Sequence, residues 1–182
     1  MDANKLDFSP LQHYLEEIHH KLKDCKDGKV ADYIPELLRA NPEWFGIAIA
    51  TVDGHVYQVG DSQQLFTIQS ISKAFVYGLA LEANGVDKIA NKVDVEPSGE
   101  AFNSISLRPD TGRPLNPMIN AGAIATTGQV DGSDGNEKLK NIMAAFSRYT
   151  GHSLSIDDDV YQSEKVAGHR NRAISHLLRG FN

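Results

Sequence analysis

The stretch FTIQSISKAF, from Phe66 to Phe75, begins like a buried strand and continues into a helix-forming run. At the junction, Ser70 precedes Lys73 by three positions, a spacing that puts both side chains on one face of a helix. A neutral lysine could take the serine proton, and the apolar neighbours could supply the burial that lowers the lysine pKa. The alternative is an N-cap serine followed by a solvated lysine. The stretch alone leaves both interpretations open.

This S-x-x-K spacing is typical of class A β-lactamases and penicillin-binding proteins. Those enzymes also carry a Ser-x-Asn motif and a Lys-Thr-Gly motif further along the chain. No Ser-x-Asn follows Ser70, and the Lys-x-Gly of Lys26-Asp27-Gly28 lies on the wrong side of the serine. The pattern therefore predicts a related chemistry on a different substrate.

The composition is that of a globular protein with one substantial core. The chain has 182 residues, 41% of them apolar and 23% charged, with a net charge of -6. Lys and Arg are scattered, which argues against nucleic acid as a partner. The longest mostly apolar stretch, Trp44 to Val52, is too short to span a bilayer. We therefore expect neither a nucleic-acid nor a membrane partner.

Motifs for metals, phosphates and disulfides are missing. The seven histidines show no metal-ligand spacing, and no Gly-rich phosphate loop is present. Cys25 is the one cysteine, so an internal disulfide is excluded. With no signal-peptide pattern at the N-terminus, this fits a reducing cytoplasm. We expect a cytoplasmic protein without cofactor or metal.

Hydrophobic periodicity and turn signals predict a mixed order of elements. They comprise a helix at about 8–24, a short helix at 33–38, a hairpin of strands at 45–52 and 55–59, a short strand at 64–68, and helices at 70–84, 119–127, 136–149 and 160–178. Residues 96–118 read as a long Pro- and Gly-containing loop, which a compact domain rarely keeps unless it builds a site. The apolar face of the last helix has no following partner, so we expect the chain to be part of a larger fold.

Five segments, in order, resemble the serine-dependent glutaminase family, which hydrolyses L-glutamine to L-glutamate and ammonia. They cover the chain from about residue 31 to its end and read ADYIPELLRANPEWFGIAIATVDGHVYQVGD, FTIQSISKAF, VEPSGEAFNSI, RPLNPMINAGAIATT and YQSEKVAGHRNRAI. The resemblance implies an α+β, β-lactamase/transpeptidase-like serine hydrolase fold, with a helical subdomain and an antiparallel sheet. Residues 1–182 would form the N-terminal portion of a single catalytic domain, incomplete at its C-terminus, in a homo-oligomer, specifically a tetramer.

The resemblance also implies site residues. Ser70, within Gln69-Ser70-Ile71-Ser72-Lys73, matches the nucleophile and Lys73 its base. The implied catalytic and substrate-contacting set is Tyr33, Gln69, Ser70, Asn120, Glu164 and Asn171. Glutamine carries an ammonium, which suits Glu164, and a carboxylate, which suits hydrogen-bond donors on Tyr33 and the two asparagines. On one continuous helix, Glu164 and Asn171 would lie about two turns apart on the same face.

The implied reaction is acyl transfer. Ser70 attacks the side-chain amide carbon after Lys73 takes its proton, the oxyanion binds backbone N–H groups, ammonia leaves, and water hydrolyses the γ-glutamyl ester. Further site tyrosines and the second oxyanion donor of the family have no counterpart in this chain. Two alternatives stay open: an S-x-x-K enzyme acting on another amide or a β-lactam, and a non-catalytic piece.

Overall fold

The computed structural model describes residues 9–97 and 99–181, which form two compact units, one ending at Thr67 and the other beginning at Ile68. The first unit holds the sheet and the second is helical, so the predicted α+β class is confirmed. The single catalytic domain remains a prediction. Among the described helices, none combines the length and the apolar character needed to cross a membrane.

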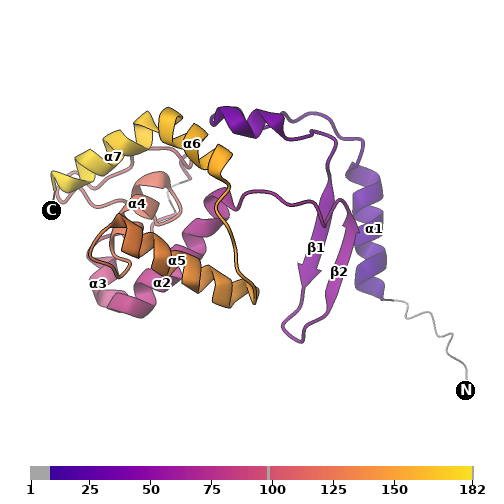
Figure 1. Cartoon of the computed structure of the whole chain (residues 1–182), viewed down its shortest axis with the longest axis horizontal. Helices are drawn as coiled ribbons and strands as arrows, with labels where there is room; N and C mark the ends of the chain where they lie inside the picture. Colours follow the sequence, from indigo (N-terminus) through magenta and orange to yellow (C-terminus); the bar gives the residue numbers. More distant parts are fainter. Residues whose placement is uncertain (1–8, 98, 182) are drawn as a thin grey trace, which may run out of the picture. The chain divides into compact units, whose positions relative to one another are not determined.

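The first unit is a helix packed beside a β-hairpin (Figure 1). Its elements are α1 (Pro10–Leu22), the 3₁₀ helix η1 (Pro35–Arg39), β1 (Gly46–Ala50) and β2 (Val56–Gly60). The strands pair antiparallel, with Ala48 opposite Gln58. The predicted Asp53-Gly54 turn joins them, and Gly54 has a φ of 90°, a conformation that glycine adopts without steric cost. The predicted hairpin is therefore confirmed.

Helix α1 covers the outer edge of β2. The side-chain amide of Gln12 donates to Gln58 O at 3.1 Å and accepts from Gln58 N at 3.3 Å. Near the other end of α1, the His19 ring stacks on Phe45 with ring centroids 4.9 Å apart. An unpaired strand edge is a template for unwanted association, and here a side-chain amide takes the place of a neighbouring strand.

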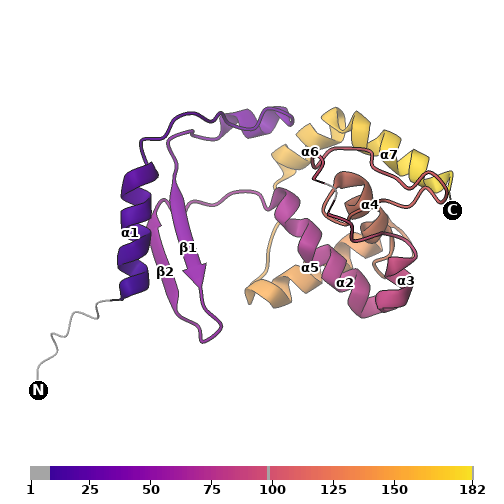
Figure 2. The ribbon, with the colours of Figure 1, turned by 180° about the vertical axis from the view of Figure 1, so that it is seen from behind.

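The second unit is built of helices joined by loops (Figure 2). Its elements are η2 (Gln69–Ile71), α2 (Ser72–Asn84), α3 (Val86–Ala90), α4 (Asn120–Gly128), α5 (Gly135–Thr150), α6 (Asp158–Ala167) and α7 (His169–Arg179). Helix α4 contacts both α2 and α7. Ile119 and Ala121 pack against Ile174 and Leu178 of α7 in one buried cluster. These contacts fix the start of α4 against α7, which matters for the site.

The long loop between α3 and α4 is irregular but well bonded. Asp94 N donates to Pro114 O at 2.8 Å, and Arg108 N donates to Arg113 O at 2.8 Å. The Asp94 carboxylate also pairs with the guanidinium groups of Arg108 and Arg113. The loop prediction is confirmed, and these bonds join distant parts of the loop to each other.

Two local predictions are wrong. Residues 64–68 form no strand, because the chain passes through a turn and an extended segment into η2. The single helix predicted over 160–178 is broken at Gly168, whose ψ of 33° ends α6 before α7 begins. Gly168 N donates to Glu164 O, one turn earlier, at 2.7 Å, and a Cβ at Gly168 would lie 2.8 Å from that oxygen, so the conformation at the break favours glycine. The short helix α3 was not predicted.

Gly122 allows α4 to approach the loop, and its replacement should destabilise the protein. A Cβ there would lie 1.9 Å from Asn116 O, a backbone atom that cannot turn aside. We expect Gly122→Ala to lower the free energy of unfolding by about 1–3 kcal/mol, measured by denaturant titration. Gly128 lies on the same helix, and a Cβ added there would have no neighbour within 4 Å, so Gly128→Ala is the control. Equal stability of the two variants would contradict the close-contact interpretation.

Candidate active site

Ser70 lies in the 3₁₀ turn η2, immediately before α2. The N-cap of α2 is Ile71, and no side chain caps the helix. Ser70 is exposed, and its hydroxyl is not the helix cap that the alternative interpretation required. Residues Ser70 to Lys73 continue through helical backbone, so the two side chains share a face as the spacing predicts. The serine is therefore accessible to a small molecule.

The residue before Ser70 adopts an unusual backbone conformation. Gln69 has a φ of 43°, and among the described residues it is the one non-glycine with a positive φ. The Ser72 hydroxyl donates to Gln69 O at 2.6 Å, which helps to hold this turn. Such conformations cost of order 1–3 kcal/mol and cluster at active sites. This turn directs the chain from the extended segment into the helix at Ser70.

Lys73 is partly buried and hydrogen bonded, in contrast to a solvated surface lysine. Its Nζ donates to Met118 O at 3.1 Å and to Asn120 Oδ1 at 2.7 Å, and lies 5.6 Å from the centroid of the Phe102 ring. Burial lowers the pKa of the Lys73 ammonium from its ordinary value. In the described part of the chain, no hydrogen bond joins Lys73 to the Ser70 hydroxyl. The role of Lys73 as base stays a prediction.

Hydrogen bonds connect Lys73 to two asparagines, Asn120 and then Asn171. Asn120 is the first residue of α4, and its backbone N–H donates to Phe102 O at 2.8 Å. Its Nδ2 donates to Asn171 Oδ1 on α7 at 3.0 Å. Both side chains are partly buried. Lys73, Asn120 and Asn171, which come from α2, α4 and α7, thus form one connected polar cluster.

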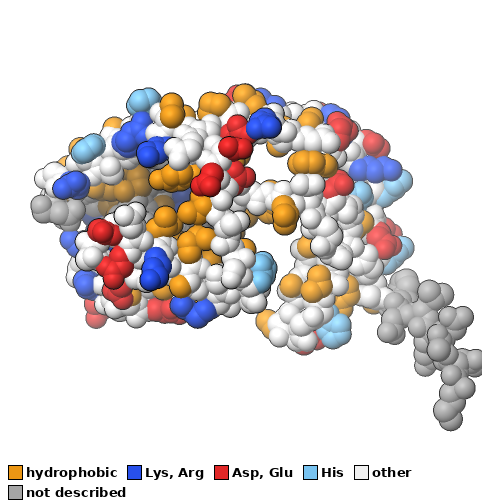
Figure 3. Space-filling model, in the orientation of Figure 1, with side chains coloured by type: hydrophobic (Ala, Val, Ile, Leu, Met, Phe, Trp, Pro, Cys, Tyr) orange, Lys and Arg blue, Asp and Glu red, His pale blue; other side chains and the backbone are white. Residues whose placement is uncertain are grey.

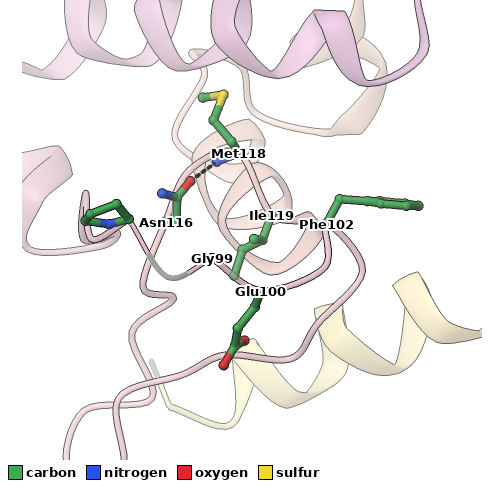
Figure 4. A pocket seen from close by; sticks show the side chains of 7 residues that line it. Gly99, Glu100, Phe102, Asn116, Met118 and Ile119 are labelled. Atoms are coloured by element: carbon green, nitrogen blue, oxygen red, sulfur yellow. Dashed lines mark hydrogen bonds between the residues drawn. The ribbon is translucent and has the colours of Figure 1, made fainter.

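A pocket of about 300 Å³ lies beside this cluster (Figure 4). The Asn116 side chain points toward Met118 and accepts its backbone N–H at 2.7 Å. Phe102 and Met118 belong both to this lining and to the surroundings of Lys73. The remaining lining residues are Pro97, Gly99, Glu100 and Ile119. The pocket wall is supplied mainly by the loop for which the sequence predicted a site.

Glu164 and Tyr33, two further predicted site residues, lie outside α2, α4 and α7. Glu164 is exposed on α6, and Gly168 separates it from Asn171 on α7, so the two do not share one continuous helix. Tyr33 belongs to the first unit, where its side chain is 53% exposed. The substrate-contacting roles of both residues stay predictions.

Sequence reasoning missed Met118 and Phe102. Met118 contributes a backbone oxygen, for which no side-chain pattern gives a signal. Phe102 belongs to the VEPSGEAFNSI segment of the long loop, and an aromatic residue in such a loop was the available signal.

Comparison with solved structures shows extensive likeness. A protein named Mglu, in its glutamate form, has a TM-score of 0.88 at 39% identity, covering 96% of this chain and 40% of that one. A probable glutaminase from Bacillus subtilis, complexed with 6-diazo-5-oxo-L-norleucine, has a TM-score of 0.80 at 31% identity, covering 99% of this chain and 54% of that one. The chain therefore has the β-lactamase-like serine hydrolase fold found in glutaminases.

Sequence comparison then defines the family. The family model described as Glutaminase matches residues 28–182. A glutaminase from Trichormus variabilis is 56% identical over 173 residues, which cover 95% of this chain and 52% of that protein. This chain belongs to the Glutaminase family. It spans about half the length of the curated relatives it matches.

Proposed function

We propose that the protein hydrolyses L-glutamine to L-glutamate and ammonia through an ester on Ser70. The observation that carries the proposal is the cluster of Lys73, Asn120 and Asn171 beside an exposed serine, in a chain of the Glutaminase family. Relatives crystallised with glutamate or with 6-diazo-5-oxo-L-norleucine support a substrate of glutamine shape.

The proposed chemistry divides amide hydrolysis into two steps. Neutral Lys73 takes the Ser70 proton while the Ser70 oxygen attacks the amide carbon. The backbone N–H of Ser70 is one candidate donor to the resulting oxyanion. The proton then passes to the leaving nitrogen, ammonia departs, and water attacks the γ-glutamyl ester to release glutamate and restore Ser70. The lowered pKa of Lys73 supports its part, because a base must be available unprotonated.

The substrate ends would be held by the polar residues that the resemblance implies. Asn171 keeps both hydrogens of its Nδ2 available, because its bond to Asn120 uses Oδ1. Those hydrogens suit the α-carboxylate of glutamine. Glu164 carries the charge needed for the α-ammonium, and Tyr33 and Gln69 complete the proposed contacts. We also propose a cytoplasmic homo-oligomer, a tetramer by family resemblance. Large exposed hydrophobic side chains such as Phe75 and Val166 are consistent with a covered surface. Figure 3 shows hydrophobic side chains among the polar ones on the face that it draws.

The test is a coupled assay for ammonia release from L-glutamine, together with calorimetric binding of the same compound. We expect ammonia release that saturates with L-glutamine, and none from a simple primary amide. Opening of a β-lactam ring frees no ammonia, so it is followed separately by absorbance, and we expect none. Binding without turnover would support the non-catalytic alternative. Hydrolysis of a β-lactam with no release from glutamine would support the other S-x-x-K chemistry.

A further inference from the structure

The hydrogen bonds that begin at Lys73 pass through the side-chain amides of Asn120 and Asn171, and each group donates to the next. A protonated lysine has only donors, so the Asn120 atom at 2.7 Å from Nζ must be the acceptor Oδ1. The other end of that amide, Nδ2, therefore faces α7, where Asn171 Oδ1 accepts it at 3.0 Å. An asparagine amide carries one accepting end and one donating end, so the Lys73 ammonium and the Asn171 acceptor favour the same orientation of the Asn120 amide.

This direction matters for a lysine that has to act as a base. A neutral amine has two N–H groups and one lone pair. The two acceptors around Lys73, Met118 O and Asn120 Oδ1, can take both N–H groups and leave the lone pair unused. If the Asn120 amide turned over, its Nδ2 would donate to that lone pair and block proton transfer from Ser70.

We propose that Asn171 is a positioning residue, which holds the Asn120 amide with its oxygen toward Lys73 and so keeps the lysine lone pair free. The inference rests on the proposed function and adds a task to Asn171 beyond contacting substrate. Rigid surroundings support it, because Ile174 and Leu178 of α7 pack on Ile119 and Ala121 at the start of α4. Core packing therefore holds α7, and with it Asn171, against the start of α4.

The proposal is tested by measuring the pKa of Lys73 in an NMR titration that observes its isotope-labelled Cε and Nζ atoms. This measurement does not require turnover. In Asn171→Ala, the turned amide would stabilise neutral lysine and the fixed acceptor of the ammonium would be lost. We expect the pKa of Lys73 to fall by about half a unit or more. In Asn171→Asp, the acceptor is kept and a negative charge is added, so this pKa should rise. Burial is the one cause of its present lowering, with no contribution from a charged neighbour among the described residues.

The matched control is Asn141→Ala. Asn141 also bridges two segments through its amide, donating to Asp131 O at 2.8 Å, but it does not bond Lys73 or Asn120. Its replacement should leave the pKa of Lys73 unchanged. Shifts of the same sign in Asn171→Ala and Asn171→Asp, or no shift in a folded Asn171→Ala, would overturn the proposal.

A double variant separates the orientation of the Asn120 amide from other effects of Asn171→Ala. In an Asn120→Asp background, both atoms that can face Lys73 are oxygens, so turning the group over changes nothing. Adding Asn171→Ala there should not lower the pKa of Lys73 relative to Asn120→Asp alone, and a fall of about half a unit or more between these two variants would refute the positioning role. Absent ammonia release with these pKa responses intact would contradict the proposed function and leave the positioning role standing.

Discussion

Replacing Ser70 with alanine should lower glutamine hydrolysis on the order of 10⁴-fold or more, because the methyl group cannot form the γ-glutamyl ester. Ser70 is exposed and does not cap α2, so the fold should be unaffected. The measurement is the coupled ammonia assay at saturating and at low glutamine. Ser147→Ala is the matched control, because its hydroxyl donates to a helix carbonyl, Met143 O, at 3.0 Å. Ammonia release that persists unchanged in Ser70→Ala would disprove the nucleophile assignment.

A covalent probe identifies the nucleophile separately from turnover. The diazoketone 6-diazo-5-oxo-L-norleucine is the compound bound in the Bacillus subtilis relative. Its diazo carbon takes a proton, dinitrogen leaves, and a nucleophilic oxygen forms a new bond to that carbon. Peptide mass spectrometry should find the adduct on Ser70, and Ser70→Ala should not be modified. An adduct on another residue would assign the nucleophile to that residue and contradict the role of Ser70.

Replacing Lys73 with methionine should lower the rate of hydrolysis by about 10²–10⁴-fold, the usual contribution of a general base. Methionine keeps most of the side-chain volume and removes the amine. The control is Lys88→Met, because Lys88 also donates to an asparagine oxygen, Asn84 Oδ1, at 2.6 Å but is exposed to solvent. We expect the control to retain full activity. Equal loss in both variants would mean that the effect at Lys73 is not specific.

The pH dependence gives a second measurement on Lys73. The base is the neutral amine, so kcat/KM should rise as the pH rises through the pKa of Lys73 in the free enzyme. Burial lowers that pKa, so the rise should be centred below the ordinary lysine value of about 10.4. The residual activity of Lys73→Met should lack this rise. A rise with the same midpoint in Lys73→Met would assign it to another group.

Local sequence signals predicted the elements whose cause is local. The hairpin follows from an Asp-Gly turn between two apolar runs, and α1 follows from its periodicity. The break at Gly168 was missed because the apolar periodicity continues across it, and a single glycine within a helical pattern is usually tolerated. Its reason is the local conformation of Gly168, where a Cβ would lie 2.8 Å from Glu164 O one turn earlier, and periodicity does not encode this. The predicted strand at 64–68 failed because apolar residues alone do not provide a pairing partner.

In the site, too, the features with a local cause were predictable from the sequence, and those that depend on packing were not. The spacing of Ser70 and Lys73 is local, and the sequence predicted their shared helix face correctly. The bond between Lys73 and Asn120 joins residues 47 positions apart, and only the packing of α2 against α4 brings them together. Family resemblance pointed to Asn120 and Asn171 as individual substrate contacts. It gave no indication that the two amides bond each other and that the pair leads to the lysine.

The positive φ of Gln69 places limits on how this protein can be made more stable. Glycine would adopt a φ of 43° without penalty, so selection for folding alone would favour glycine immediately before the serine. Glycine would also loosen the turn that leads into Ser70 and would remove the Gln69 side chain. A thermostability screen that scores only melting temperature would therefore tend to accept Gln69→Gly, and this position is one that an engineer should protect from such a screen.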